Sequence, residues 1–105
     1  MVNKKQKLRR ENLSAKEIVL TLNKHKDELR KYKVKKIGLF GSFLKNNQNK
    51  KSDVDLLVEF DKTTFDDYMD LKLFLEKLFK RKVDLVVEKN LKPALRYVKK
   101  EAIYA

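Results

Sequence analysis

The chain of 105 residues has no cysteine, one histidine, one proline and two glycines. The absence of cysteine excludes disulfide bonds and thiolate metal sites, and it is typical of a reducing compartment. With so little proline and glycine no segment has the composition of a linker, so we expect one small domain with a single core. No apolar run approaches the length of a membrane span, and the N-terminus lacks the apolar core of a secretory signal. These absences favour a cytoplasmic protein.

Acidic side chains are scarce in the first half of the chain. Residues 1–52 carry 16 basic and 4 acidic side chains, a net charge of +12, whereas residues 53–105 carry 11 of each. A basic half of this kind would attract nucleic acid, nucleotide phosphates or an acidic partner protein. However, 22 of the 27 basic residues are lysines mixed with many asparagines, as a compositional bias alone would produce. Both explanations stay open.

The hydrophobic pattern predicts an α/β domain with the element order α-β-α-β-α-β-α, a small mixed sheet with helices against it. Residues 1–11 have little apolar content, and we interpret them as a basic, flexible N-terminal arm before a domain at residues 12–105. The expected elements are a helix over 14–31 that begins at a capping box of Ser14 and Glu17, a strand over 34–40, a short helix from 43, a strand over 53–60, a helix from about 66 to 80, a strand over 83–88, and a helix opened by Asn90 to Pro93.

The helical periodicity also predicts which side chains face the core. In the last helix Leu95 and Val98 are expected to face inward. In the preceding helix Met69 and Leu73 lie off the apolar stripe, which indicates either cover by neighbouring elements or a partner surface. His25 falls on the apolar stripe of the first helix, so we interpret it as a packed side chain without a catalytic role.

Two aspartates open the second predicted strand, ten residues after a Gly41-Ser42 pair. Asp53 and Asp55 are two residues apart, so in a strand their side chains point to the same face. Two adjacent carboxylates repel each other unless a cation lies between them, and Mg²⁺ is a hard ion that suits oxygen ligands. The Gly41-Ser42 turn offers backbone N–H groups and a hydroxyl to an anion. A phosphate-binding turn beside a metal-carboxylate pair indicates phosphoryl or nucleotidyl transfer.

A third acid, Asp84, stands at the start of the third predicted strand. The first strand must end near the start of the second to bring Gly41 to Asp53, so we expect these two strands to be antiparallel. If the second and third strands are adjacent and parallel, Asp84 joins Asp53 and Asp55 at one edge of the sheet. The alternatives are a turn-and-cap role for the aspartate pair and a solvated position for Asp84.

These residues resemble the nucleotidyltransferase superfamily to which polymerase β belongs. The resemblance is carried by Gly41-Ser42, Asp53-x-Asp55 and a later strand with Asp84, and it covers roughly residues 34–104. The short length and the run over residues 41–60 are similar to the minimal nucleotidyltransferase (MNT) branch. Related sequences often have Ala-Arg-Gly where residues 44–46 read Leu-Lys-Asn, so Lys45 keeps the charge but loses the bidentate fork of arginine.

The resemblance implies an ATP-dependent transferase with two Mg²⁺ ions. The residues that it implies as both catalytic and metal-binding are Asp53, Asp55 and Asp84. The residues that it implies for nucleotide binding are Gly41, Ser42 and Lys45. MNT proteins commonly act as antitoxins that transfer AMP to a tyrosine of a HEPN-domain ribonuclease toxin, so such a toxin is the expected partner in a hetero-oligomer.

Other functions remain open from the sequence. One is a binding module with a vestigial site, which sequesters a toxin or contacts nucleic acid through the basic half of the chain. Another is nucleotide transfer to a small molecule, although such enzymes usually need a second domain to hold that molecule. Polymerisation is not expected, because the chain has no room for a template-binding domain.

Overall fold

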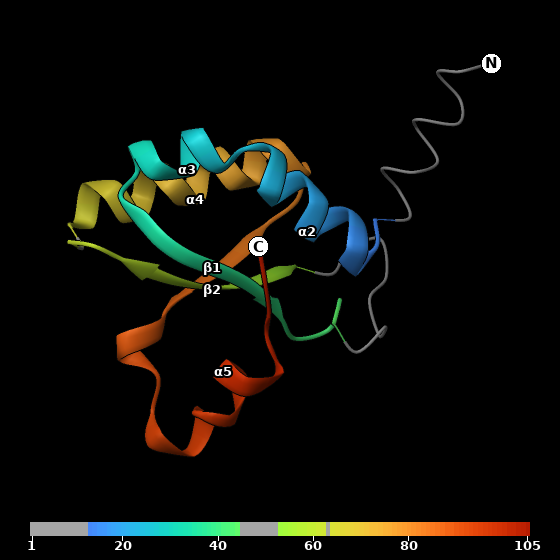
Figure 1. The fold of residues 1–105 in the computed structure, drawn as a ribbon, viewed down its shortest axis with the longest axis vertical. Helices are drawn as coiled ribbons and strands as arrows, with labels where there is room; N and C mark the ends of the chain where they lie inside the picture. Colours follow the sequence, from blue (N-terminus) through green and yellow to red (C-terminus); the bar gives the residue numbers. More distant parts are fainter. Residues whose placement is uncertain (1–12, 45–52, 63) are drawn as a thin grey trace.

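The structure is a computed structural model that describes residues 13–44, 53–62 and 64–105. Within these ranges the chain forms one four-stranded sheet in the order β3-β2-β1-β4, with helices packed against it (Figure 1). In chain order the elements are α2 (Ala15–Lys24), α3 (Lys26–Lys31), β1 (Val34–Phe40), β2 (Val54–Phe60), α4 (Phe65–Phe79), β3 (Val83–Val87), the 3₁₀ turns η1 (Glu88–Asn90) and η2 (Pro93–Leu95), α5 (Tyr97–Glu101) and β4 (Ile103–Tyr104). The predicted α/β class is confirmed. The predicted N-terminal arm lies outside the described residues.

The strand directions agree with the sequence analysis. β1 is antiparallel to β2, and β2 is parallel to β3. The observed β1 has the predicted bounds, and β2 and β3 differ from the predicted bounds by one residue. The sequence analysis missed β4, which pairs antiparallel with the free edge of β1. A two-residue strand has no periodicity of its own to find, because alternation needs several residues to be visible.

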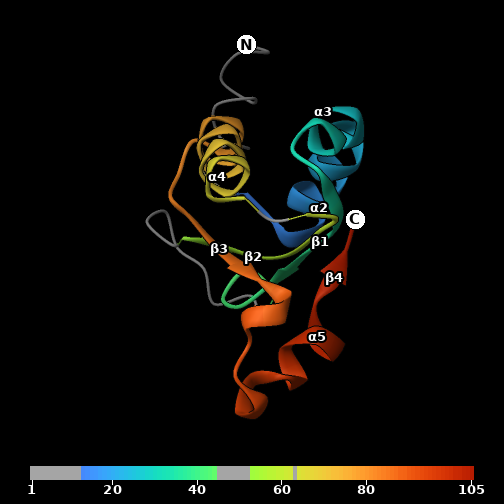
Figure 2. The same cartoon turned by 90° about the vertical axis from the view of Figure 1, so that its left-hand side faces the viewer.

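Helices α2, α3 and α4 cover one face of the sheet, while the segment from η1 to α5 extends on the other side (Figures 1 and 2). The main core fills the space between the three helices and the sheet. Its fully buried members, at 0% exposure, are Ile18, Leu22, Leu39, Val54, Leu56, Val58, Leu71 and Leu75. These residues recur at helical spacing in the helices and at alternate positions in β2, which is why the pattern could be read from the sequence.

The predicted first helix is broken at His25. Ser14 caps its start by accepting a hydrogen bond from the Glu17 N–H at 3.2 Å, as the capping box predicted. At His25 the backbone leaves the helix (φ −109°, ψ 24°), so α2 ends there and α3 begins one residue later. The imidazole Nδ1 lies 2.8 Å from the Thr21 carbonyl oxygen, and the ring meets Phe74 edge-on at 6.0 Å. His25 is therefore a packed side chain at a helix break, as expected.

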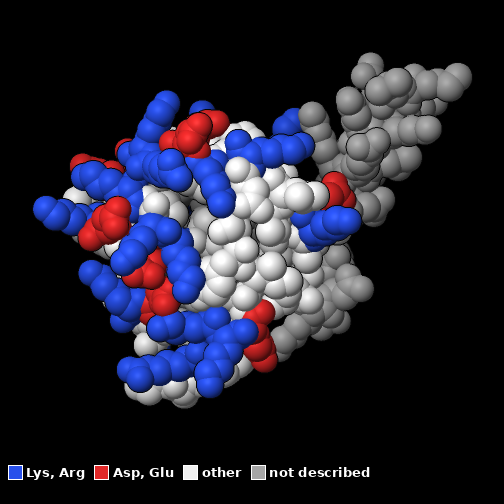
Figure 3. Space-filling model, in the orientation of Figure 1, with Lys and Arg blue, Asp and Glu red and all other residues white. Residues whose placement is uncertain are grey.

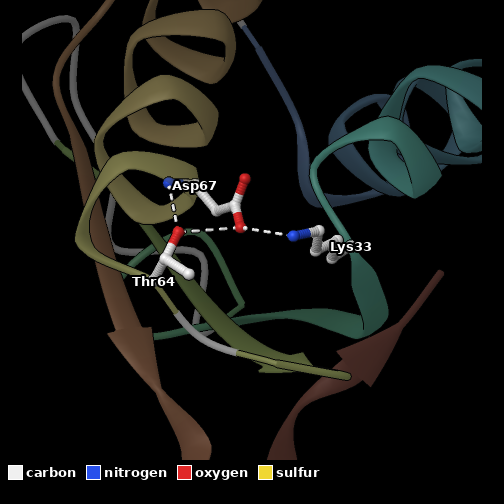
Figure 4. Close-up of polar contacts among 3 residues, drawn as sticks. All are labelled: Lys33, Thr64 and Asp67. Carbon is white, nitrogen blue, oxygen red and sulfur yellow. Dashed lines mark hydrogen bonds and ion pairs between the residues drawn. The ribbon is translucent and has the colours of Figure 1, made fainter.

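The start of α4 is tied to the loop before β1 (Figure 4). Thr64 caps the helix by accepting a hydrogen bond from the Asp67 N–H at 3.1 Å, and its hydroxyl donates to the Asp67 carboxylate at 2.8 Å. The same carboxylate lies 3.5 Å from the Lys33 ammonium. An N-cap of this kind stabilises a helix by about 1 kcal/mol, more than a half-exposed ion pair contributes. The cap thus fixes where α4 begins.

The end of the chain differs most from prediction. A single helix after Pro93 was expected, but the chain forms two 3₁₀ turns and the five-residue helix α5. Val98 is buried as predicted, whereas Leu95 is 42% exposed, so its inward placement was wrong. In α4, Leu73 is 54% exposed and Met69 is half-buried, so only Leu73 remains a candidate for a partner surface.

Close backbone packing holds β4 onto the sheet. Gly38 in β1 lies opposite Tyr104, and a Cβ atom at Gly38 would stand 2.8 Å from the Tyr104 Cδ1 and 3.2 Å from the Ile103 carbonyl oxygen. The Lys36 ammonium lies 4.2 Å from the centroid of the Tyr104 ring. Glycine is therefore needed at position 38 because the ring of Tyr104 covers it.

The charged side chains form a mixed surface. On the face in Figure 3, lysines and arginines gather toward one side with acidic residues among them, and they surround an uncharged area. Lys35 in β1 forms an ion pair with Glu59 in β2 at 3.6 Å, and Lys99 in α5 forms one with Glu88 in η1 at 2.9 Å. The Lys35–Glu59 pair is exposed and contributes little to stability, whereas the Glu88 side chain is only 11% exposed. No helix in the described ranges is long and apolar enough to cross a membrane.

Replacing Gly38 with alanine tests the packing of β4. Gly38→Ala is expected to destabilise the protein by about 1–3 kcal/mol, the usual effect of overpacking, because its Cβ displaces Tyr104. In a Tyr104→Ala background the same change should cost much less, and urea unfolding of the four proteins in this double-mutant cycle measures the difference. Equal costs in both backgrounds would show that Tyr104 does not lie on Gly38.

Candidate active site

The strand register places two of the predicted catalytic acids side by side. Asp55 in β2 is paired with Asp84 in the parallel strand β3, and with Phe40 in the antiparallel strand β1. Residues directly opposite each other share a face of a sheet, so these three side chains form one row across three strands. Phe40 lies at the end of β1, and the two acids lie near the starts of β2 and β3. The row therefore stands at one edge of the sheet.

Asp53 lies just before β2, two residues before Asp55. Both Asp53 and Asp84 are exposed, while Asp55 is half-buried. All three carboxylates are close enough for Asp53 and Asp84 to act electrostatically on Asp55. As the side chains stand, no group of three or more His, Cys, Asp or Glu in the described residues is arranged to hold a metal ion. The structure thus brings the three acids to one edge without closing a ligand cage.

The surroundings of Asp55 shift the pKa of its carboxyl group. Burial is the main cause that raises the pKa of Asp55 above its ordinary value, because it disfavours the charged carboxylate. The charges of Asp84 and Asp53 raise the pKa further, whereas a hydrogen bond from the backbone N–H of Ser42 lowers it. The net direction is upward. Keeping Asp55 ionised in the folded protein therefore costs free energy, and a bound cation would offset that cost.

Mg²⁺ prefers oxygen ligands, and its positive charge offsets the repulsion between neighbouring carboxylates. The three aspartates therefore suit this ion. Asp53, Asp55 and Asp84 are all carboxylates, and no softer ligand stands beside them in the register. The raised pKa of Asp55 reflects its burial first and the negative charges of Asp84 and Asp53 after that. Asp53 and Asp84 are exposed at this edge, so neither side chain is fixed by packing.

The predicted phosphate-binding turn packs directly on Asp55. Gly41 has φ +80°, a conformation that side chains disfavour, and a Cβ atom at this position would overlap the Asp55 carboxylate. The backbone N–H of Ser42 is engaged by that carboxylate. This N–H was predicted to bind phosphate, and it instead holds the acid. The Ser42 hydroxyl remains as the side-chain donor of the turn.

The chain after Ser42 forms turns up to residue 44, where the sequence predicted the start of a short helix. Phe43 is buried beneath this turn, at 1% exposure. Lys45, predicted to bind the nucleotide, lies outside the described residues. Arg81, which the sequence analysis did not single out, stacks on Phe43 with its guanidinium carbon 5.2 Å from the ring centroid. The only sequence feature that could have pointed to Arg81 is its position just before β3.

A cavity of about 350 Å³ opens beside the row of acids. Its floor comes from the sheet and its other wall from the C-terminal segment, and its lining is Phe40, Gly41, Asp84, Val86, Leu91, Leu95, Tyr97, Val98 and Glu101. Residues from η1 onward were not predicted to belong to the site. The sequence offered no signal for them, because they are brought to Asp84 by the turns and by the pairing of β4.

Comparison with known sequences gives consistent matches. A model of the nucleotidyltransferase domain family matches residues 22–105. A Methanocaldococcus jannaschii protein provisionally named a protein adenylyltransferase is 46% identical over 88 residues, which cover 80% of this chain and 86% of that protein. The protein adenylyltransferase MntA of Thermococcus cleftensis is 37% identical over 95 residues, 88% of this chain and 96% of that protein.

Solved structures match over a similar range. One, provisionally described as a minimal nucleotidyltransferase, has a TM-score of 0.67 at 35% identity and covers 81% of this chain and 93% of its own. A toxin–antitoxin crystal structure with AMP-PNP has a TM-score of 0.64 at 26% identity, over 78% and 69%. A complex of tri-AMPylated Shewanella oneidensis HEPN toxin with its MNT antitoxin has a TM-score of 0.58 at 25% identity, over 81% and 68%.

Removing the charge of Asp55 should stabilise the metal-free protein. A folded-state pKa above the unfolded value means that stability present at low pH is lost as pH rises through the folded pKa. Asp55→Asn should therefore melt at a higher temperature than the parent chain at pH 7 in EDTA, and the difference should shrink below about pH 4. Asp70→Asn removes one negative charge from an exposed position of α4, so it is the control and should leave the melting temperature at pH 7 in EDTA close to that of the parent chain. Equal melting of Asp55→Asn and the parent chain at pH 7 would contradict the proposed repulsion.

The Gly41 turn should tolerate no side chain. Gly41→Ala combines the left-handed backbone with an overlap on Asp55, and it should destabilise the protein by about 1–2 kcal/mol from the backbone strain alone. In a background with Asp55→Ala the overlap with the carboxylate disappears, while the backbone strain and a close approach of 2.9 Å to the Cβ atom of residue 55 remain. Denaturant unfolding measures both costs, and an Asp55-independent cost would show that the turn does not rest on that carboxylate.

Proposed function

The chain belongs to the nucleotidyltransferase domain family, and on this premise we propose that it is an antitoxin that transfers AMP from ATP to a tyrosine of a HEPN-domain toxin. The observation that carries the proposal is the row in which Asp55 and Asp84 pair across parallel strands, with the Gly41 turn packed on Asp55. Relatives named protein adenylyltransferases and neighbours crystallised as toxin–antitoxin pairs support the choice of reaction and partner.

The metal would be held by Asp53, Asp55 and Asp84. When bound, Mg²⁺ supplies positive charge that stabilises the triphosphate and the departing pyrophosphate and acidifies an attacking hydroxyl. Two ions are expected from the family resemblance. The exposed positions of Asp53 and Asp84 leave both side chains free to turn toward the ligand.

The chain's own residues would position the reactants. The Ser42 hydroxyl, at the mouth of the turn, would donate to a phosphate oxygen, and Lys45 would add a positive charge nearby. The acceptor tyrosine would approach from the side of Asp84, whose carboxylate can take the phenolic proton. The tyrosine oxygen then forms a bond to the α-phosphorus while the bond to pyrophosphate breaks, which leaves AMP on the tyrosine.

Turnover distinguishes this enzyme from a protein that merely binds its partner. A substoichiometric amount of the chain, with ATP and Mg²⁺, should add AMP to a molar excess of its proposed HEPN-domain partner, as measured by intact mass after denaturation. Asp53→Asn and Asp55→Asn should each lower the rate at least roughly a hundredfold, because loss of metal charge costs several kcal/mol of transition-state stabilisation. Asp70→Asn should retain full activity.

The result that would overturn the proposal is neutralisation at a one-to-one ratio with no mass added to the toxin. In that case the protein would act as a binding module, and the aspartate variants would neutralise as well as the parent chain.

A further inference from the structure

The cavity beside Asp84 has a lining that no step of the proposed reaction yet uses. Most of its walls are apolar, with Phe40 and Val86 on the sheet side and Leu91, Leu95 and Val98 on the C-terminal side. Its volume of about 350 Å³ lies at the small end of the roughly 300–1,000 Å³ typical of ligand pockets. A space of this size and polarity suits a single ring better than a sugar with phosphates.

The charged groups of the lining have one sign only. Asp84 and Glu101 are the two ionisable acids, and the lining contains no lysine, arginine or histidine. No ion pair joins either acid to another residue in the described part of the chain. Phosphates would reach Asp84 only through a bound cation, and elsewhere in the cavity Glu101 would repel them. The nucleotide's charged end is therefore better placed at the metal-binding edge, toward Ser42.

Hydrogen-bonding chemistry separates the two rings that could enter. Ionised carboxylates only accept hydrogen bonds, and a phenol presents one donor, its O–H group. Adenine presents two N–H donors on its amino group and three ring-nitrogen acceptors, and for those three acceptors the lining offers a single side-chain donor, the Tyr97 hydroxyl. The acceptor-rich lining is thus the better complement of a phenol.

The mouth of the cavity is apolar as well. Leu95 is 42% exposed and Tyr97 is 51% exposed, and both line the cavity. Exposed apolar side chains at the rim of a pocket are typical of a surface that meets another protein. The molecule that delivers the ring is therefore a protein and not a free small molecule.

We propose that this cavity receives the acceptor tyrosine of the protein substrate, and that Leu95 and Tyr97 determine acceptor specificity. The proposal rests on the adenylyltransferase function proposed above. The tyrosine ring lies between the sheet and the C-terminal segment, its hydroxyl meets Asp84, and the surrounding backbone of the toxin contacts the rim. A serine or threonine hydroxyl is too short to reach Asp84 while its backbone stays at the rim.

The test compares steady-state kinetics for the two substrates. Leu95→Ala and Tyr97→Ala, alone and together, should raise the KM for the HEPN protein about tenfold or more, with the KM for ATP and kcat unchanged. Tyr97→Phe keeps the ring, so its KM for the HEPN protein should rise less than that of Tyr97→Ala. Leu73→Ala, an equally exposed leucine on α4, is the matched control and should change neither KM.

Two kinetic results would overturn the proposal. A rise in the KM for ATP, with the KM for the acceptor unchanged, would mean that the cavity holds the nucleoside. No change in either constant would mean that the cavity takes no part. Because Leu95 and Tyr97 are exposed and make no side-chain hydrogen bond in the described structure, loss of folding is not the expected cause of an effect, and circular dichroism of each variant checks this.

A binding experiment separates failure of this proposal from failure of the proposed function. Capped tripeptides Gly-Tyr-Gly and Gly-Ser-Gly are titrated into methyl-labelled protein, and NMR shifts are followed at Val86, Leu91, Leu95 and Val98. The tyrosine peptide should shift these signals and the serine peptide should not, whether or not AMP transfer occurs. Absence of AMP transfer alone would overturn the enzymatic function, and absence of shifts would overturn the acceptor cavity.

Discussion

The parallel pairing of β2 with β3 is the constraint on which the whole site depends. Its register sets Asp55 opposite Asp84 on neighbouring strands, which lie about 4.8 Å apart in sheets. A shift of one residue would turn one carboxylate to the opposite face. The register is held by the alternate residues Val54 and Leu56, which are fully buried against the helices and would be exposed by such a shift. Core packing on one face of the sheet thus fixes the chemistry on the other face.

This arrangement has an energetic cost that the core must offset. Burial and two neighbouring carboxylates act against the charge of Asp55, and among the described residues the backbone N–H of Ser42 is the group that opposes them. Gly41 allows that N–H to approach, because a side chain there would occupy the space of the carboxylate. Sites that break the rules of stable packing are commonly functional. Three carboxylates gathered at one edge of the sheet, one of them with a raised pKa, are an arrangement that suits a cation-binding site.

How much could be predicted from the sequence depended on how local the signal was. The strands and their directions followed from apolar runs and from the need to bring Gly41 near Asp53, and the structure has them. The break at His25 could not be foreseen, because the apolar stripe continues across it. The role of the Ser42 N–H was also missed, since residue type indicates that a turn binds an anion but not which anion, and here it is the protein's own Asp55.

The C-terminal segment shows why a wall of the site escaped prediction. Residues 88–101 form short turns whose positions are set by β4, and β4 is held by the contact of Tyr104 with Gly38, far away in the chain. Contacts of this kind carry no periodicity. The acids and the turn come from residues 41–84, while the opposite wall of the cavity comes from the C-terminal segment. Under the function and the acceptor cavity proposed above, substitutions in that segment would change which protein is modified without disturbing the aspartates.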